Sequence, residues 1–89
     1  KMEAEIEYCV PCGYGNLAAY MVSELFQAGG PSLAISVVPG HSGAFKVTVD
    51  GKVLWDKKRD GRSPHIMEVK DLKAEVANML QSGSVIQAN

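Results

Sequence analysis

The spacing of apolar residues in the first half of the chain predicts a strand, a helix and a second strand. Residues 3–8 alternate polar and apolar side chains with period two, which is typical of a strand with one wet face. Residues 14–26 carry apolar side chains at helical spacing, and the Gly-Gly-Pro run at 29–31 is expected to end that helix. Residues 33–38 are almost continuously apolar and predict a second strand, which ends at Pro39.

The second half of the chain begins with the pattern of a β-hairpin. Residues 45–49 and 52–56 flank Asp50-Gly51. An Asp-Gly pair is a strong signal for a two-residue type I′ turn, because both central positions need positive φ. A turn of that kind sets the register of the two strands. The cross-strand pairs that we expect are Val49 with Lys52 and Val47 with Leu54.

A last helix is predicted after residues 57–60, which are all charged and are expected to form a solvated loop. Ser63-Pro64 has the residue types of an N-cap and a first helical residue. The apolar stripe of the helix consists of Ile66, Val69, Leu72, Val76, Met79 and Leu80. Gly83 is expected to end the helix. We therefore predict one domain over residues 1–81 and a frayed polar tail over residues 82–89.

The element order β-α-β-β-β-α predicts a mixed four-stranded sheet that is covered on one face. A helix joins the first two strands, so they should be parallel, whereas the last two form an antiparallel hairpin. One face collects the apolar side chains of Ala4, Ile6, Tyr8, Leu33, Ile35, Val37, Phe45, Val47, Val49 and Leu54. The other face is mostly polar, with Val53 and Trp55 as exceptions. Both helices should cover the apolar face, which gives an α/β fold built as a two-layer α+β sandwich.

The length, charge and motifs of the chain exclude several classes of binding partner and cofactor. The chain has 89 residues, enough for one domain, and a formal net charge of −1, which gives no electrostatic case for binding nucleic acid or acidic lipid. We find no apolar stretch near the roughly 18 residues that span a bilayer, so no membrane partner is predicted. The first residues lack the pattern of a secretory signal. No glycine loop of the GxGxxG or Walker type is present, so we predict no small-molecule cofactor.

The strongest chemical signal is the pair Cys9 and Cys12, with Val10 and Pro11 between them. Two cysteines are too few for a disulfide scaffold, and a loop this short gives little stabilisation when closed. Thiol–disulfide chemistry in a reducing compartment, the cytoplasm, explains the pair better. The reactive species is the thiolate, and a position between a strand end and a helix start lowers a thiol pKa from its usual value of about 8.5. Pro11 is expected to act as a rigid spacer.

Other interpretations of the cysteine pair are that it is buried and inert, or that it is half of a zinc site. In the zinc alternative His41 and His65 would supply the remaining ligands. Zinc sites usually combine two compact ligand pairs, and these histidines are far apart in the sequence, so no metal is predicted. Which of the two sulfurs attacks a partner disulfide also stays undecided at this point. The local helix dipole slightly favours Cys9, with Cys12 as the resolving thiol.

Two further places are candidate binding surfaces. A mixed four-stranded sheet with a CxxC after its first strand is the minimal thioredoxin-like arrangement. In such a sheet the segment that enters the third strand lies beside the CxxC, so His41, Ser42 and Gly43 are expected to meet an extended partner segment. His41 is a candidate to hydrogen-bond a thiol or to assist proton transfer, and alternatively is simply solvated. Trp55, which we expect on the polar face of the sheet, is either an interface anchor or a cover for that face.

Three regions together resemble the selenoprotein W-type redox family: residues 6–14, residues 43–51, and residues 55–58 with 61–64. The resemblance covers nearly the whole chain. It implies a thioredoxin-like fold and redox activity, with selenocysteine in some members at the position that matches Cys12, which favours Cys12 as the nucleophile. The family usually has an aromatic residue where this chain has Ser63. That difference either leaves a shallower groove or lets Ser63 cap the following helix.

The expected function is thiol–disulfide exchange by Cys9 and Cys12 with a protein or glutathione partner. The alternative is an interaction module in which the dithiol is a redox switch, with Trp55 or the His41 loop recruiting a protein. A carrier passes electrons repeatedly to a model disulfide, whereas a switch only changes its binding when it is oxidised. The sequence leaves the oligomeric state open.

Overall fold

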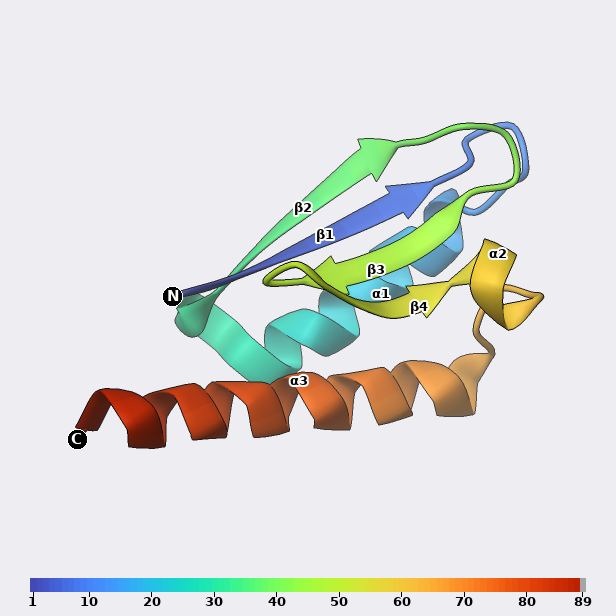
Figure 1. Cartoon of the computed structure of the whole chain (residues 1–89). Coiled ribbons are helices and arrows are strands. Elements are labelled where there is room, and N and C mark those ends of the chain that lie inside the picture. Colours follow the sequence, from blue (N-terminus) through green and yellow to red (C-terminus); the bar gives the residue numbers. More distant parts are fainter. Residues whose placement is uncertain (89) are drawn as a thin grey trace.

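The computed structural model describes the backbone of residues 1–88 and the side chains of residues 1–82 (Figure 1). Along the chain the elements are β1 (Met2–Tyr8), α1 (Gly15–Gly29), the 3₁₀ turn η1 (Gly30–Ser32), β2 (Leu33–Pro39), β3 (Phe45–Val49), β4 (Lys52–Asp56), α2 (Lys57–Asp60) and α3 (Ile66–Ala88). The predicted order of four strands and two long helices is confirmed. The short helix α2 replaces the solvated loop that we expected at residues 57–60.

The four strands form one sheet in the order β2-β1-β3-β4. β1 is parallel to β2 and antiparallel to β3, and β3 is antiparallel to β4, so the sheet is mixed as predicted. Both long helices lie on one face of the sheet (Figure 1), where their apolar side chains join those of the strands in a single core. The core residues contributed by the helices are Ala18, Met21 and Leu25 from α1 and Val69, Leu72 and Val76 from α3. The two-layer sandwich is confirmed.

One apolar side chain that we placed on the covered face is exposed. Val37 pairs with Ile6, so it points toward the helix layer, yet 42% of its surface is accessible whereas Ile6 is fully buried. The difference follows from position, because β2 is an outer strand of the sheet and β1 lies inside it.

The hairpin turn has the predicted geometry, but the strands beyond it do not have the predicted register. Asp50 and Gly51 have φ of 49° and 82°, as a type I′ turn requires. Val49 pairs with Lys52 as expected, whereas Val47 pairs with Trp55 and not with Leu54. A β-bulge causes the difference: β4 contains one more residue than β3 can match.

The bulge also corrects the face that we assigned to Trp55. Because Trp55 lies opposite Val47, which is fully buried, the indole points toward the helix layer and packs against the core. Leu54, the extra residue, is buried as well. The prediction that Trp55 lies on the polar face of the sheet is therefore wrong.

The two long helices are joined by a buried carboxylate that the apolar pattern did not indicate. Glu24 of α1 is 6% exposed, and its Oε1 atom lies 3.2 Å from Lys70 Nζ and 3.8 Å from Lys73 Nζ of α3. The hydrogen bond to Glu24 raises the pKa of the Lys70 ammonium group. This ion pair fixes how α1 and α3 lie side by side.

Helix α3 begins and ends later than the sequence predicted. The N-cap is His65, not Ser63: the His65 ring accepts the Met67 N–H at 3.3 Å, and the Glu68 carboxylate accepts the His65 N–H at 3.1 Å. These reciprocal bonds form a capping box, and they place the helix start at Ile66. The helix runs past Gly83, where we expected it to end, since one interior glycine costs only about 1 kcal/mol.

Candidate redox site

The two cysteines lie in the loop between β1 and α1, where they form a disulfide with a Cα–Cα distance of 5.4 Å. Their surroundings differ. Cys9 is fully buried, and its N–H donates a 2.8 Å hydrogen bond to the Ala44 carbonyl in the segment that enters β3. Cys12 is exposed. A partner molecule can therefore reach the sulfur of Cys12 more easily than that of Cys9.

The backbone between the cysteines is a tight turn closed by one hydrogen bond. The Gly13 N–H donates to the Val10 carbonyl at 3.1 Å, with Pro11 and Cys12 between them. Gly13 has φ of +81°, a conformation that side-chain-bearing residues rarely adopt. Val10 is 55% exposed and Pro11 is exposed too. The turn thus presents Val10, Pro11 and Cys12 to solvent as one continuous surface.

Helix α1 follows directly and leaves its first N–H groups available. Its N-cap, Tyr14, makes no side-chain capping hydrogen bond, and the first turn contains no acidic residue. Unpaired N–H groups and the helix dipole favour a negative charge near this end. The Tyr14 ring packs edge-on against Phe45, with centroids 6.0 Å apart, which fixes the helix start against β3. The site is therefore suited to holding a thiolate.

The loop between β2 and β3 lies against this turn. Gly40 donates its N–H to the Tyr8 carbonyl at 2.8 Å, and Ala44 donates to the His41 carbonyl at 3.1 Å. His41 is largely exposed, and its Nδ1 atom lies 3.5 Å from Glu7 Oε2. The structure thus brings the predicted loop to the cysteine pair by backbone contacts, while the imidazole lies beside a carboxylate.

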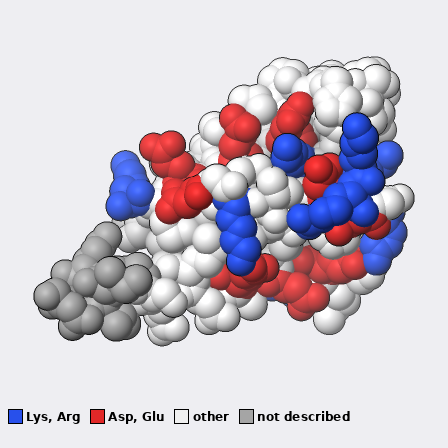
Figure 2. Space-filling model, viewed as in Figure 1, with Lys and Arg blue, Asp and Glu red and all other residues white. Residues whose placement is uncertain are grey.

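A hollow of about 680 Å³ adjoins the loop on the polar side of the sheet. His41, Ser42 and Gly43 form part of its wall, and Lys46 and Lys57 form another part. Charged side chains crowd this end of the molecule around α2 (Figure 2). Glu7 and Asp56 line it as well, so the hollow offers both cationic and acidic groups next to the segment that carries Ala44.

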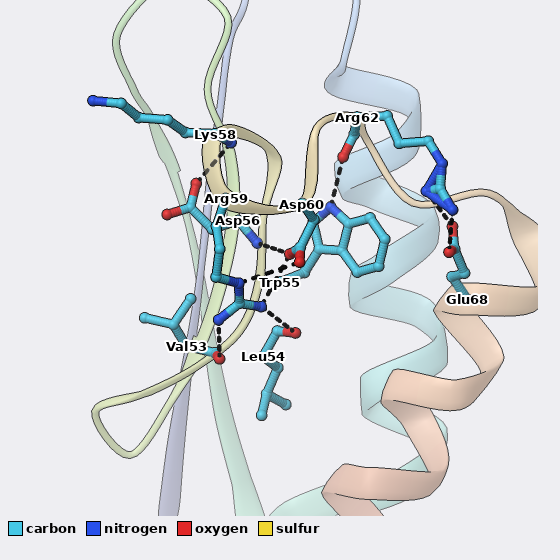
Figure 3. Close-up of polar contacts among 9 residues, drawn as sticks. All are labelled: Val53, Leu54, Trp55, Asp56, Lys58, Arg59, Asp60, Arg62 and Glu68. Atoms are coloured by element: carbon cyan, nitrogen blue, oxygen red, sulfur yellow. Dashed lines mark hydrogen bonds and ion pairs between the residues drawn. The ribbon is translucent and has the colours of Figure 1, made fainter.

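Trp55, the remaining predicted site residue, is held within the chain itself (Figure 3). Its indole N–H donates to the Arg62 carbonyl at 2.9 Å, and the Arg62 guanidinium lies 5.6 Å from the centre of its ring. Arg62 in turn forms an ion pair with Glu68 at 2.6 Å. The indole therefore ties the end of β4 to the segment that enters α3.

Around Trp55, the residues of α2 form a network that the sequence did not predict (Figure 3). Asp56 caps α2 by accepting the Lys58 N–H at 3.0 Å. Arg59 donates to the carbonyl groups of Val53 and Leu54, both at 3.3 Å, and pairs with Asp60 at 3.0 Å. The hydrogen bond from Arg59 lowers the pKa of the Asp60 carboxyl. We call the set Trp55, Asp56, Arg59, Asp60, Arg62 and Glu68 the polar corner.

The described residues contain no group of three or more His, Cys, Asp or Glu side chains that could hold a metal ion. His41 and His65, the ligands considered for zinc, lie beside Glu7 and Glu68 respectively. Within the same described part of the chain, we find no helix long and apolar enough to cross a membrane.

Comparison with known proteins identifies relatives of this chain. The model of the Rdx family matches residues 3–78. Migration and invasion enhancer 1 from Mus musculus is 27% identical over 77 residues, which are 82% of this chain and 63% of the mouse protein. The chain therefore spans less than two thirds of that relative's length.

Two crystal structures have similar folds. A protein from Bordetella parapertussis is 32% identical, with a TM-score of 0.72 over 83% of this chain and 94% of that one. A selenoprotein W-related protein from Vibrio cholerae is 23% identical, with a TM-score of 0.74 over 90% of this chain and 96% of that one. At 23% identity, the similarity to the Vibrio cholerae protein shows a common fold and no more.

Proposed function

Because the chain belongs to the Rdx family, we propose that it is a thiol–disulfide redox protein whose Cys9 and Cys12 cycle between a dithiol and a disulfide. One observation carries the proposal: the CxxC pair is bonded in a turn where one sulfur-bearing residue is buried and the other is exposed. A structural disulfide gains little from so short a loop. An exchange reaction, in contrast, needs one accessible sulfur and one protected sulfur close to it.

In the proposed reaction Cys12 is the attacking residue. Its thiolate attacks a partner disulfide, forms a Cys12–partner mixed disulfide and expels one partner thiolate. Cys9 then loses its proton and attacks the Cys12 sulfur, which expels the second partner thiolate and leaves the Cys9–Cys12 disulfide. Two electrons pass to the partner. Exposure thus favours Cys12, against the slight preference for Cys9 that the helix dipole gave.

We propose that the partner is a protein disulfide or glutathione, acting in the cytoplasm. A partner that reaches Cys12 meets Val10 and Pro11 of the same turn, and the backbone of His41, Ser42 and Gly43 offers a second contact. The adjoining hollow carries the lysines Lys46, Lys57 and Lys58, which outnumber its acidic residues Glu7 and Asp56 and so suit the carboxylates of such a partner. Trp55 is assigned to the polar corner and not to partner binding, because Arg62 engages both its N–H and its ring.

A titration across a glutathione redox series, with thiols counted by mass spectrometry, tests this function. We expect a mass change of two hydrogen atoms with a midpoint between roughly −180 and −270 mV, the range of exchange-active dithiols. Neither Cys9→Ser nor Cys12→Ser should show that change. If no internal disulfide forms anywhere in the series, the redox proposal is wrong.

A second candidate function is supported by the exposure of Val10. An apolar side chain that is 55% exposed in the redox turn is suited to binding a protein in only one oxidation state. The protein would then be a switch that does not turn over. Repeated reduction of a model disulfide by catalytic amounts of the protein supports the carrier, and a single stoichiometric reaction supports the switch.

A further inference from the structure

The two edges of the sheet are protected to very different degrees. At the β4 edge, Arg59 donates to the carbonyl groups of Val53 and Leu54, Lys52 pairs with Glu75, and a bulge interrupts the ladder. Covered carbonyls, edge lysines and bulges are the devices by which proteins prevent a sheet edge from pairing with another chain. The β4 edge is therefore closed to further strands.

The β2 edge has none of these three devices among its own residues, and its one edge proline, Pro39, stands at the very end of the strand. β2 is seven residues long, Leu-Ala-Ile-Ser-Val-Val-Pro, and contains no charged residue. It is the outermost strand and borders the sheet in Figure 1. Ser36 is exposed, and Val37 is 42% exposed. A long, uncharged and regular edge strand is a template for pairing with another strand.

The direction of each backbone N–H and C=O group of β2 determines which of them can pair with another strand. Gly40 donates its N–H to Tyr8 of β1, and inward and outward groups alternate along a strand. The N–H and C=O groups of Ile35 and Val37 therefore point away from β1. The backbone of Pro39 points away from β1 as well. Proline has no N–H, so β2 loses an outward donor there and no hydrogen bond to β1, as is usual for proline in an edge strand.

We propose that β2 pairs with β2 of a second copy of this chain, antiparallel and with the twofold axis at Ser36. In that register Ile35 of each copy lies opposite Val37 of the other. Both residues have outward N–H and C=O groups, so each pair exchanges both backbone hydrogen bonds. The side chains of each pair also share the helix side of the sheet, because Ile35 and Val37 lie beside Ala4 and Ile6 of the core.

Helix α1 adds an apolar residue to the same border. Phe26 is 61% exposed. It lies two positions from Glu24, whose carboxylate contacts α3, so helical periodicity directs Phe26 away from α3 and toward the β2 side. Pairing of two β2 strands would bring the α1 helices of both copies toward each other and cover Phe26 together with Val37.

Several features favour a second copy over an unrelated partner. The edge has no charge with which to select a different strand, and opposite charges usually set such a choice. Its outward groups are complementary to themselves in the antiparallel register. Antiparallel pairing also directs the two CxxC turns to opposite ends of the joined sheet, so that both redox sites stay accessible. The inference is thus independent of the proposed redox function.

Sedimentation equilibrium of the full chain tests the proposal, with amide exchange measured on the same samples. We expect a dimer in which the Ile35 and Val37 amides exchange more slowly as the protein concentration rises. Val37→Lys should raise the dissociation constant at least about tenfold, because it places like charges near the twofold axis. Met67→Lys is the matched control: it changes another exposed apolar residue, at the start of α3, and should leave the dimer intact.

Val37→Pro provides a second variant that removes one outward donor and no bond to β1. It should weaken the dimer while leaving the circular dichroism spectrum unchanged. A monomer whose Ile35 and Val37 amides exchange at the same rate at all concentrations overturns the proposal. So does a dimer that Val37→Lys does not weaken. A monomer whose Ile35 and Val37 amides exchange more slowly only when an extended peptide of unrelated sequence is added shows an edge that accepts a foreign strand, and also overturns it.

Discussion

The CxxC turn and the polar corner both lie at the carboxyl ends of strands, β1 and β4, yet they are held in opposite ways. The turn is fixed by its disulfide and by backbone hydrogen bonds, through Gly13, Ala44 and Gly40. The polar corner is fixed by side chains that bind each other, from Trp55 to Glu68. Both regions carried motifs that the sequence marked as functional.

The difference shows how to separate a reactive motif from a supporting one. In the polar corner the indole N–H, the two arginines and the carboxylates all have partners within the chain. In the turn, Cys12 and Val10 face solvent. A group that already has partners within the chain is less available to bind another molecule. Cys12, which is exposed and precedes an uncapped helix N-terminus, is available to react.

The largest effect is expected from Cys12→Ser. Without the exposed sulfur no mixed disulfide can form on the accessible side, so turnover with a model disulfide should fall by more than about 100-fold. The thermal unfolding of the reduced protein should stay unchanged, because Cys12 is exposed. A large loss of stability in the reduced form would instead show that Cys12 supports the fold.

A change at Trp55 should have the reverse pattern. Trp55→Ala removes a partly buried ring and its hydrogen bond to Arg62, which should lower the free energy of unfolding by about 2–3 kcal/mol. Trp55→Phe keeps most of the ring and should cost about 1 kcal/mol. Both variants should keep the redox midpoint of the parent. A shifted midpoint with normal stability would place Trp55 at the redox site.

Gly13 allows a test of the backbone of the turn alone. A Cβ at Gly13 meets no atom within 4 Å, so Gly13→Ala acts through its φ of +81° and should cost about 1–2 kcal/mol. Gly15→Ala is the control, since that glycine also has open space around it and its φ is not positive. Denaturant unfolding should show a loss of stability for Gly13→Ala and no loss for Gly15→Ala.

The smallest effect concerns the pH dependence of the polar corner. The hydrogen bond from Arg59 lowers the pKa of the Asp60 carboxyl in the folded protein. A lowered folded pKa gives a stabilisation that is present above the unfolded pKa, near 3.9, and is lost as the pH falls through the folded value. Thermal unfolding against pH should show this acid-side loss in the parent and a weaker one in Asp60→Asn. If the parent and Asp60→Asn lose stability equally as the pH falls, Asp60 does not cause this pH dependence.

Most of the fold could be predicted because its signals are local. Asp50-Gly51 specifies its own turn, and period-two alternation in residues 3–8 specifies the buried face of β1. The bulge in β4 could not be read in this way. It directs Leu54 and Trp55, which are adjacent in sequence, both toward the helix layer, and the hydrogen bond from the Trp55 indole to the Arg62 carbonyl joins that arrangement to a later segment.

The candidate site could likewise be predicted only as far as its signals are local. The CxxC spacing identifies Cys9 and Cys12, but it does not show that Cys9 is buried and bonded to the backbone of Ala44, which is distant in sequence. Glu24 illustrates the point within the core, since its partners Lys70 and Lys73 lie on another helix. Contacts between distant segments decide which side chains remain available, and periodicity does not report them.

The most direct test of the division of roles between the cysteines is the rate of glutathione addition to the reduced single variants. Cys9→Ser and Cys12→Ser would each be mixed with oxidised glutathione, and the mixed disulfide followed by mass spectrometry. We predict rapid addition to Cys12 in Cys9→Ser and at least about tenfold slower addition to the buried Cys9 in Cys12→Ser. Faster addition to Cys9 would contradict the account, because the buried sulfur would then be the reactive one.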